Sequence, residues 1–121
     1  MKTLGDYTHQ KQSTLFKKYG TFFAFGDEQF RRERKKDVQY VNAGIGMFCP
    51  KENIEKLIEG LKKISINGIL EDIRENGKTS IIKRELANHE YGYTGEIEQT
   101  VEALGDYPIT IEQIKEVASK L

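Results

Sequence analysis

The clearest helical pattern lies in the middle of the chain, where apolar residues recur every three or four positions. The stripe consists of Ile54, Leu57, Ile58, Leu61 and Ile64. It predicts an amphipathic helix that begins at Pro50, because proline is favoured in the first turn of a helix. Asn67-Gly68 predicts an interruption of this helix. Gly77 predicts the end of a shorter continuation that starts at Ile69.

Two earlier segments have the composition or the alternation of strands. Residues Thr21 to Phe25 are β-branched or aromatic, and residues Val38 to Phe48 alternate between apolar and other side chains. In the second segment Gly44 and Gly46 fall on the same face. Two glycines weaken a strand, so they indicate a bulge, a closely packed neighbour or a bound ligand at that face.

The remaining segments read as helices. The first is predicted from Asp6, as a possible N-cap, to Tyr19, and a short second helix from Asp27 to Lys36 is held by Phe30 alone. Three more helices are predicted over Ser80 to Glu90, Gly95 to Leu104 and Ile111 to Leu121. Thr110 and Gln113 have the spacing of a capping box at the start of the last one.

Together these elements predict an α+β fold, with a short antiparallel sheet covered by helices and a helical C-terminal third. The 121 residues suit one domain, with its strand-containing part in residues 1–66 and its helical part in residues 67–121. A two-stranded sheet is marginal in water. We therefore expect covering helices, a third strand or a homodimer to complete it.

Composition narrows the classes of function. The 19 basic and 19 acidic side chains cancel, so the whole chain presents no strong field to nucleic acid or membrane. The charges are unevenly placed, with 13 basic and 8 acidic residues up to Lys63 and 6 basic and 11 acidic residues after it. This asymmetry either orients a partner or pairs one half of the fold with the other.

The cysteine count and the lengths of the apolar runs indicate the cellular compartment. The single cysteine, Cys49, cannot form an internal disulfide, and we expect it to be buried and inert. No apolar run has the length of a signal peptide core or a membrane span. We expect a cytoplasmic location.

The segment from Arg84 to Gly95 is the main candidate site. Its candidate binding residues are Arg84, Asn88, His89, Glu90, Tyr91 and Tyr93, and the candidates for proton transfer among them are His89, Glu90 and Tyr91. One histidine beside one glutamate lacks the three or four ligands of a metal site, so no metal is expected. The alternative is structural, because His89 continues the apolar stripe of Ile82 and Leu86.

A second candidate site is a basic run. Its members are Arg31, Arg32, Arg34, Lys35 and Lys36, with Phe22, Phe23, Phe30 and Tyr40 as nearby rings for stacking on bases. The same rings are better explained as core residues, so nucleic acid is the less favoured partner. The segment from Asn42 to Gly46 lacks the third glycine of a nucleotide-binding loop, and no cofactor is expected.

Three stretches carry a resemblance to a known group of proteins. They are KYGTFFAF at 18–25, NAGIGMFCPKEN at 42–53 and IIKRELANHEYGYTGEIEQTVEAL at 81–104. The chain resembles a family of small bacteriophage and prophage proteins to which no function is assigned. The resemblance runs from Lys18 to the C-terminus and transfers no catalytic role. It implies a phage-type accessory protein made in the bacterial cytoplasm.

These observations favour a non-enzymatic binding or regulatory protein that acts on a host or defence protein. The first alternative is a small enzyme or ligand-binding protein that uses His89 and Glu90. The second is nucleic-acid binding through the basic run from Arg31 to Lys36. The partner, the oligomeric state and the number of strands are left open by the sequence.

Overall fold

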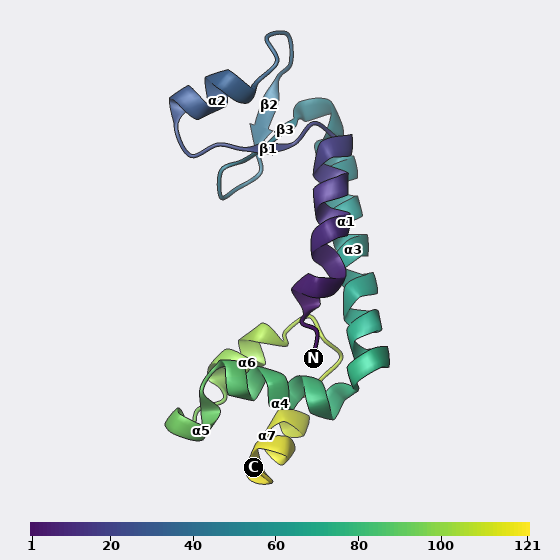
Figure 1. Ribbon diagram of the computed structural model, residues 1–121, viewed down its shortest axis with the longest axis vertical. Helices are drawn as coiled ribbons and strands as arrows, with labels where there is room; N and C mark the ends of the chain where they lie inside the picture. The colour runs from purple at the N-terminus through teal and green to yellow at the C-terminus, as the bar shows by residue number, and fades with distance from the viewer. The chain divides into compact units, whose positions relative to one another are not determined.

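The computed structural model describes all 121 residues and confirms the α+β class (Figure 1). The chain divides into two compact units, an N-terminal unit of Lys2–Gly68 and a C-terminal unit of Ile69–Leu121. All strands belong to the N-terminal unit, and the C-terminal unit is helical. One long helix, α3 (Ile54–Asn76), contributes residues to both. That the chain folds as one cooperative domain stays a prediction.

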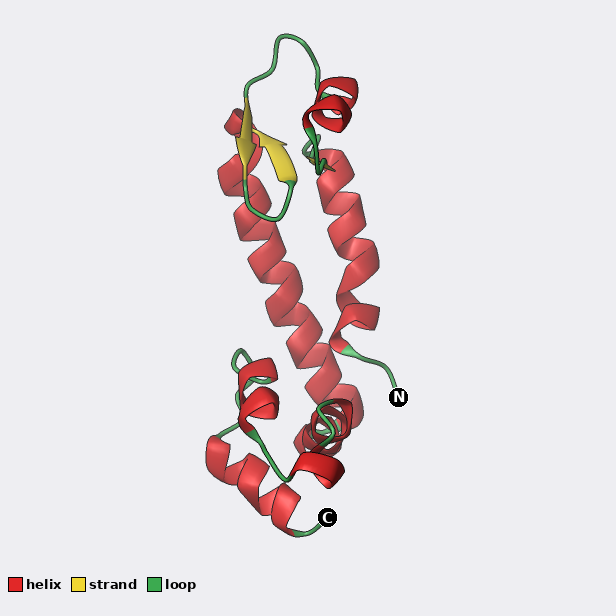
Figure 2. Ribbon diagram, turned by 90° about the vertical axis from the view of Figure 1, so that its left-hand side faces the viewer, coloured by secondary structure: helices red, strands yellow, loops and turns green.

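The sheet has three short strands. Strands are coloured yellow in Figure 2. They are β1 (Phe22–Phe23), β2 (Tyr40–Asn42) and β3 (Met47–Pro50). The order is β1-β3-β2 and both pairings are antiparallel, with Phe22 opposite Phe48 and Val41 opposite Cys49. A two-stranded sheet alone is marginally stable in water, and the third strand adds the pairing that it needs to be stable.

The prediction of one strand over Val38 to Phe48 is wrong, because the segment folds back on itself as a hairpin. Its turn contains three successive residues with positive φ: Gly44 at 102°, Ile45 at 52° and Gly46 at 73°. Gly46 also lies so close to the backbone oxygen of Ala24 that a Cβ atom there would be 2.8 Å from it. The two glycines therefore serve a turn and a close backbone contact.

Both faces of the sheet are covered by aromatic side chains from helices. On one face, Phe30 of α2 (Asp27–Glu33) packs on Phe48, with ring centroids 4.6 Å apart. On the other, Phe16 of α1 (Leu4–Lys18) meets the edge of Phe23 at 5.4 Å. Cys49 is fully buried, as expected. The short helix predicted to reach Lys36 ends at Glu33.

Helices α1 and α3 run antiparallel and approach closely at two glycines of α3. A Cβ at Gly60 would lie 2.7 Å from Leu15, and one at Gly68 would lie 2.5 Å from Thr8. The predicted interruption at Asn67-Gly68 is therefore wrong. Gly68 keeps its helical conformation and provides room for α1 instead of ending the helix.

The first helix also begins earlier than predicted. Thr3 is its N-cap, and Asp6 is the third residue of a capping box in which its carboxylate accepts the Thr3 N–H at 2.8 Å. At the other end of the helix pair, the residues Lys51–Asn53 form a single 3-10 turn between β3 and α3.

The C-terminal unit consists of the end of α3 and four further helices. They are α4 (Lys78–Asn88), α5 (Tyr91–Thr94), α6 (Glu98–Ala103) and α7 (Ile111–Ser119). The predicted capping box of α7 is confirmed, since Thr110 Oγ1 accepts the Gln113 N–H at 3.1 Å. The buried core of this unit comprises Ile69, Ile81, Ile82, Leu86, Leu104, Tyr107, Ile114 and Ala118.

Two helices in this unit start at residues other than those expected. Helix α4 starts two residues early, at Lys78, directly after Gly77 with its φ of 76°. The helix predicted to start at Gly95 starts at Glu98, because Gly95 adopts a left-handed conformation that ends α5. No helix in the structure is both long enough and apolar enough to cross a membrane.

Candidate functional site

The most heavily hydrogen-bonded side chain of the C-terminal unit is the carboxylate of Asp72 on α3. Arg84 of α4 binds it through two parallel N–H···O bonds of 3.0 and 2.9 Å. Tyr107, between α6 and α7, donates its hydroxyl to Oδ2 at 2.5 Å. Asn76, one turn further along α3, donates to Oδ1 at 2.8 Å. One carboxylate thus joins three segments of the chain.

This cluster is closed to solvent. Asp72 has no exposed surface, and the side chain of Arg84 is 8% exposed. The guanidinium is further engaged by Glu85, whose Oε1 accepts from Nε at 3.1 Å. A charge pair that is buried, bidentate and supported by neutral donors is satisfied within the fold and has no surface to offer a substrate.

The pKa values of the cluster reflect competition between burial and hydrogen bonding. Burial acts to raise the pKa of Asp72, but the bonds from Arg84, Tyr107 and Asn76 outweigh it and hold the pKa below its usual value of 3.8. Burial, together with the bond to Asp72, raises the pKa of the Tyr107 phenol well above its usual value of 10.0. The cluster therefore favours an ionised Asp72 and a neutral Tyr107.

These shifts predict a pH dependence of stability with two limits. The contribution of Asp72 is complete above its unfolded pKa of about 3.9 and is lost as the pH falls toward its lower folded pKa. The contribution of Tyr107 is complete below about pH 10 and is lost as the pH rises further. Urea denaturation across this range measures both. We expect Asp72→Asn to remove the acid limit and Tyr107→Phe the alkaline one; unchanged profiles in both variants would contradict the assignment.

The structure separates the residues predicted as a site from Arg84 to Tyr93. Arg84 belongs to the buried cluster, whereas Asn88 and Glu90 are exposed. His89 is half-buried, and its Nε2 lies 3.6 Å from Glu85 Oε2. Glu90 has a φ of 56° and turns the chain from α4 into α5, so its carboxylate forms no hydrogen bond or ion pair with His89.

Tyr91 and Tyr93 lie instead beside a broad hollow of about 740 Å³ next to α4. It is lined by Lys83, Leu86, Ala87, Tyr91, Gly92, Tyr93, Thr94, Gly95 and Leu121. The ring of Tyr93 is almost fully exposed, at 93%, and Tyr91 is half-buried. The two rings are therefore available to contact a ligand, although they are not joined to His89 or Glu90.

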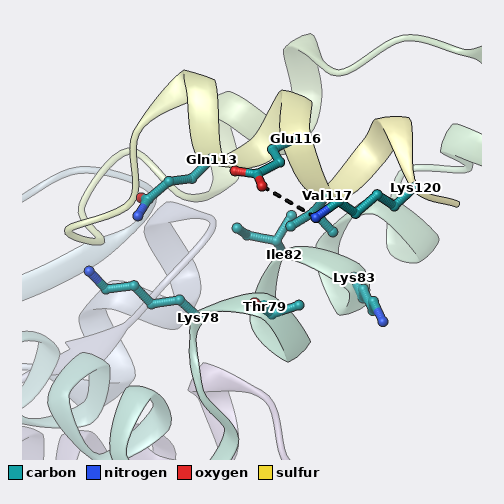
Figure 3. Close-up of a pocket in the computed structure, with 8 residues that line it drawn as sticks. All are labelled: Lys78, Thr79, Ile82, Lys83, Gln113, Glu116, Val117 and Lys120. Atoms are coloured by element: carbon teal, nitrogen blue, oxygen red, sulfur yellow. Dashed lines mark hydrogen bonds and ion pairs between the residues drawn. The ribbon is translucent and has the colours of Figure 1, made fainter.

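A second hollow, of about 270 Å³, lies between α4 and α7 (Figure 3). It is lined by Lys78, Thr79, Ile82, Lys83, Gln113, Glu116, Val117 and Lys120. Figure 3 shows Ile82 and Val117 pointing toward each other between the two helices, with Lys78 and Lys83 extending from α4 in different directions. The floor of this hollow is apolar and its rim is charged.

The two hollows follow the same side of α4 and share Lys83. Residues 78, 79, 82, 83, 86 and 87 are spaced as one side of a helix and span about 14 Å along its axis. We name the combined surface the α4 groove. Its length matches about two and a half turns of a helix.

The charge of the α4 groove is opposite to that of its surroundings. Residues 69–121 contain 11 acidic and 6 basic side chains, yet three of the four lysines among them line the groove. Glu116 is the one acidic side chain in the lining, and Lys120 Nζ is 3.3 Å from its Oε1. Lys78 and Lys83 have no ion-pair partner, so the groove carries an uncompensated positive charge.

Sequence reasoning missed Asp72, Tyr107 and the groove lysines. For Asp72 a signal existed: it follows Ile69 by three residues and precedes Asn76 by four, which places a carboxylate on the buried stripe of α3. No sequence signal indicated that the groove lysines lie together. Lys78 and Lys120 are 42 positions apart, and only the packing of α4 against α7 brings them to one hollow.

The basic run lies in the N-terminal unit, and all of its members are exposed: Arg31, Arg32, Arg34, Lys35 and Lys36. Of the rings proposed to stack on bases, Phe22, Phe30 and Tyr40 pack on one another, with centroids 5.2 to 5.9 Å apart. Phe23 packs on Phe16 and keeps 42% of its surface exposed. The cations are thus available to a ligand, and most of the rings are not.

The model of a family of unknown function (DUF7659) matches residues 4–121. No curated protein and no solved structure matches the chain.

Proposed function

Because the chain belongs to the DUF7659 family of unknown function, we propose a function from its own geometry. The protein is a non-enzymatic binding protein that holds an acidic, amphipathic segment of another protein in the α4 groove. Such a segment presents carboxylates along one edge and apolar side chains along another. The groove has the complementary pattern.

The observation that carries this proposal is the uncompensated charge above an apolar floor. Val117, Tyr91 and Leu121 provide accessible apolar surface for side chains of a ligand, above the buried Ile82 and Leu86, and burial there is favourable by about 25 cal/mol per Å². Lys78 and Lys83 are placed beside that surface without a partner. Helix-in-groove recognition uses this combination, in which apolar anchors supply affinity and charges select the partner.

The alternative of an enzyme that uses His89 and Glu90 has less support. Catalysis by an acid and a base requires both groups within reach of one reacting atom. His89 Nε2 lies 3.6 Å from Glu85 Oε2, and Glu90 is exposed at the turn into α5. A ligand at Tyr91 and Tyr93 is compatible with the groove and needs neither residue.

The biological setting is proposed on the resemblance alone. The segments NAGIGMFCP and LANHEYGYTG resemble phage and prophage proteins, so we place the protein in the bacterial cytoplasm as a phage-type accessory protein. Its partner would then be a host or defence protein. A homodimer is compatible with this role where its interface lies on a face other than the α4 groove.

Selection from a random peptide library on the immobilised full chain tests the proposal. We expect enriched peptides to combine Asp or Glu with apolar residues at spacings of three and four, the pattern of an amphipathic helix. Their binding to the isotopically labelled protein should shift the amide NMR signals of residues 78–87 and 113–121. Enriched peptides without acidic residues, or shifts confined to other segments, would contradict the proposal.

A matched pair of variants separates the groove from the overall charge. Lys83 is shared by both hollows, whereas Lys115 is an exposed lysine of α7 that lines neither. Lys83→Glu should weaken peptide binding at least tenfold, consistent with the 1.4 kcal/mol or more that a reversed contact charge costs. Lys115→Glu, with the same change in net charge, should leave it within about twofold. Equal effects of the two substitutions would refute the groove.

A further inference from the structure

The N-terminal unit contains a separate pocket that is rich in lysine. It lies where the end of α1, the segment after α2 and the 3-10 turn before α3 meet, and has a volume of about 260 Å³. Its lining is Lys17, Lys18, Tyr19, Gly20, Lys35, Val38, Tyr40, Pro50, Glu52 and Asn53. We name it the lysine pocket. It shares no residue with the α4 groove, and nothing below depends on the proposed function.

The lysine pocket has several donors and few acceptors. Lys17, Lys18 and Lys35 are exposed, and none of them has a carboxylate partner. The hydroxyl oxygen of Tyr40 accepts the backbone N–H of Lys35 at 3.0 Å, which leaves its own proton free to be donated. Glu52 is the single carboxylate in the lining. The pocket therefore has an excess of two positive charges.

The pocket continues into a longer strip of cations. Lys35 belongs both to the pocket and to the exposed run that contains Arg31, Arg32, Arg34 and Lys36. None of the five forms an ion pair with an acidic side chain. Unlike the chain as a whole, the N-terminal unit has an excess of basic residues, 13 against 8 acidic ones in Lys2–Gly68.

We infer that the lysine pocket binds a phosphate group of single-stranded nucleic acid, and that the run from Arg31 to Lys36 contacts neighbouring phosphates. A polynucleotide carries one negative charge for each nucleotide, and strips of Lys and Arg bind it by releasing condensed counterions. Tyr19 lies half-buried in the pocket wall with Lys18 Nζ 5.4 Å from its ring centroid, and a base next to the bound phosphate can stack on the ring in place of that ammonium group.

A single strand fits this surface better than a duplex or an acidic peptide. Helix α2 has seven residues and is fixed to the sheet by Phe30, so it is not free to enter a major groove. An acidic peptide needs apolar anchors for affinity. The cationic run from Arg31 to Lys36 contains no apolar side chain, whereas phosphates need only cations and donors.

Fluorescence anisotropy with a labelled oligothymidylate of about 15 nucleotides tests the inference, since single-strand binding folds cover about 4–16. Each phosphate contact contributes a salt dependence of about −0.7, or about fivefold in affinity near 0.1 M salt. The triple variant Lys17→Gln/Lys18→Gln/Lys35→Gln loses the phosphate held in the pocket, so it should bind at least about fivefold more weakly and show a salt slope smaller by at least about 0.7. Circular dichroism confirms that the variant remains folded.

The control removes the same charge elsewhere in the unit. Lys56, Lys62 and Lys63 are exposed lysines of α3 that lie outside the pocket, and their triple substitution by Gln should keep the wild-type salt slope. Equal slopes in the two triple variants would overturn the inference. So would tighter binding of a duplex of the same length, equal binding of polyglutamate, or binding of inorganic tripolyphosphate without binding of the oligonucleotide.

Discussion

Replacing Asp72 with alanine is expected to lower the free energy of unfolding by about 3–5 kcal/mol, the range found when one partner of a buried ion pair is removed. The substitution leaves the guanidinium of Arg84 charged and buried beside an empty space. It also removes the acceptor of the Tyr107 hydroxyl and of the Asn76 amide. Since small domains are stable by about 5–15 kcal/mol, much of the stability of the C-terminal unit depends on this carboxylate.

Chemical denaturation monitored by circular dichroism measures this loss. Asp106→Ala is the matched control, because Asp106 is an exposed aspartate of the same unit and forms no hydrogen bond or ion pair through its side chain. It should change the stability by less than about 0.5 kcal/mol. The variant Asp72→Leu/Arg84→Met/Tyr107→Phe, which removes all three charged or polar partners, should recover most of the loss. A loss below about 1 kcal/mol for Asp72→Ala would contradict a buried, charged cluster.

Replacing Gly68 with alanine is expected to destabilise the N-terminal unit by about 1–3 kcal/mol, the usual cost of overpacking. In an exposed helix the same change would stabilise by about 1 kcal/mol, because alanine has the higher helix propensity. At Gly68 the new Cβ would lie 2.5 Å from Cγ2 of Thr8. Thr8 is buried, β-branched and bonded through Oγ1 to the Leu4 carbonyl, so it has little freedom to move.

Two further variants show whether the contact with Thr8 causes this loss. Thr8→Ser removes the clashing methyl group and should rescue Gly68→Ala. At Gly60 the nearest atom is Cδ2 of Leu15, the end of a flexible side chain, so Gly60→Ala should be neutral or stabilise by up to about 1 kcal/mol. Thermal denaturation of the three variants distinguishes these effects. A stabilised Gly68→Ala would mean that α1 is not packed against this residue.

The parts of the fold that follow from nearby residues could be predicted from the sequence. The capping box of Thr110 and Gln113 needs residues three positions apart, and it is present as expected. The α+β class followed from an alternating segment and several periodic ones. The boundaries that failed did so by a few residues, as at Asp6, where the cap belongs to Thr3.

The failures came from contacts between residues distant in sequence. Gly68 has the composition of a helix break, and its role is set by Thr8, 60 positions earlier. The hairpin turn contains Ile45, a β-branched residue at positive φ, which no turn rule predicts. Asp72 and Tyr107 are 35 positions apart, and a carboxylate on a helix reads as exposed until its partners are known. For the same reason, the binding surface that we propose, with lysines of α4 and α7, differs from the site that the sequence predicted at His89.

The pairing of α1 with α3 has a consequence for the order of events during synthesis. The contacts of Leu15 with Gly60 and of Thr8 with Gly68 span 45 and 60 residues, so α1 leaves the ribosome long before its partner. At about 5–20 residues per second, the delay for Gly68 is about 3–12 s. An isolated helix of 15 residues is marginal in water, so α1 stays largely unfolded and accessible to chaperones during that interval. The first helix of the chain is therefore fixed only after the middle of the chain has been made.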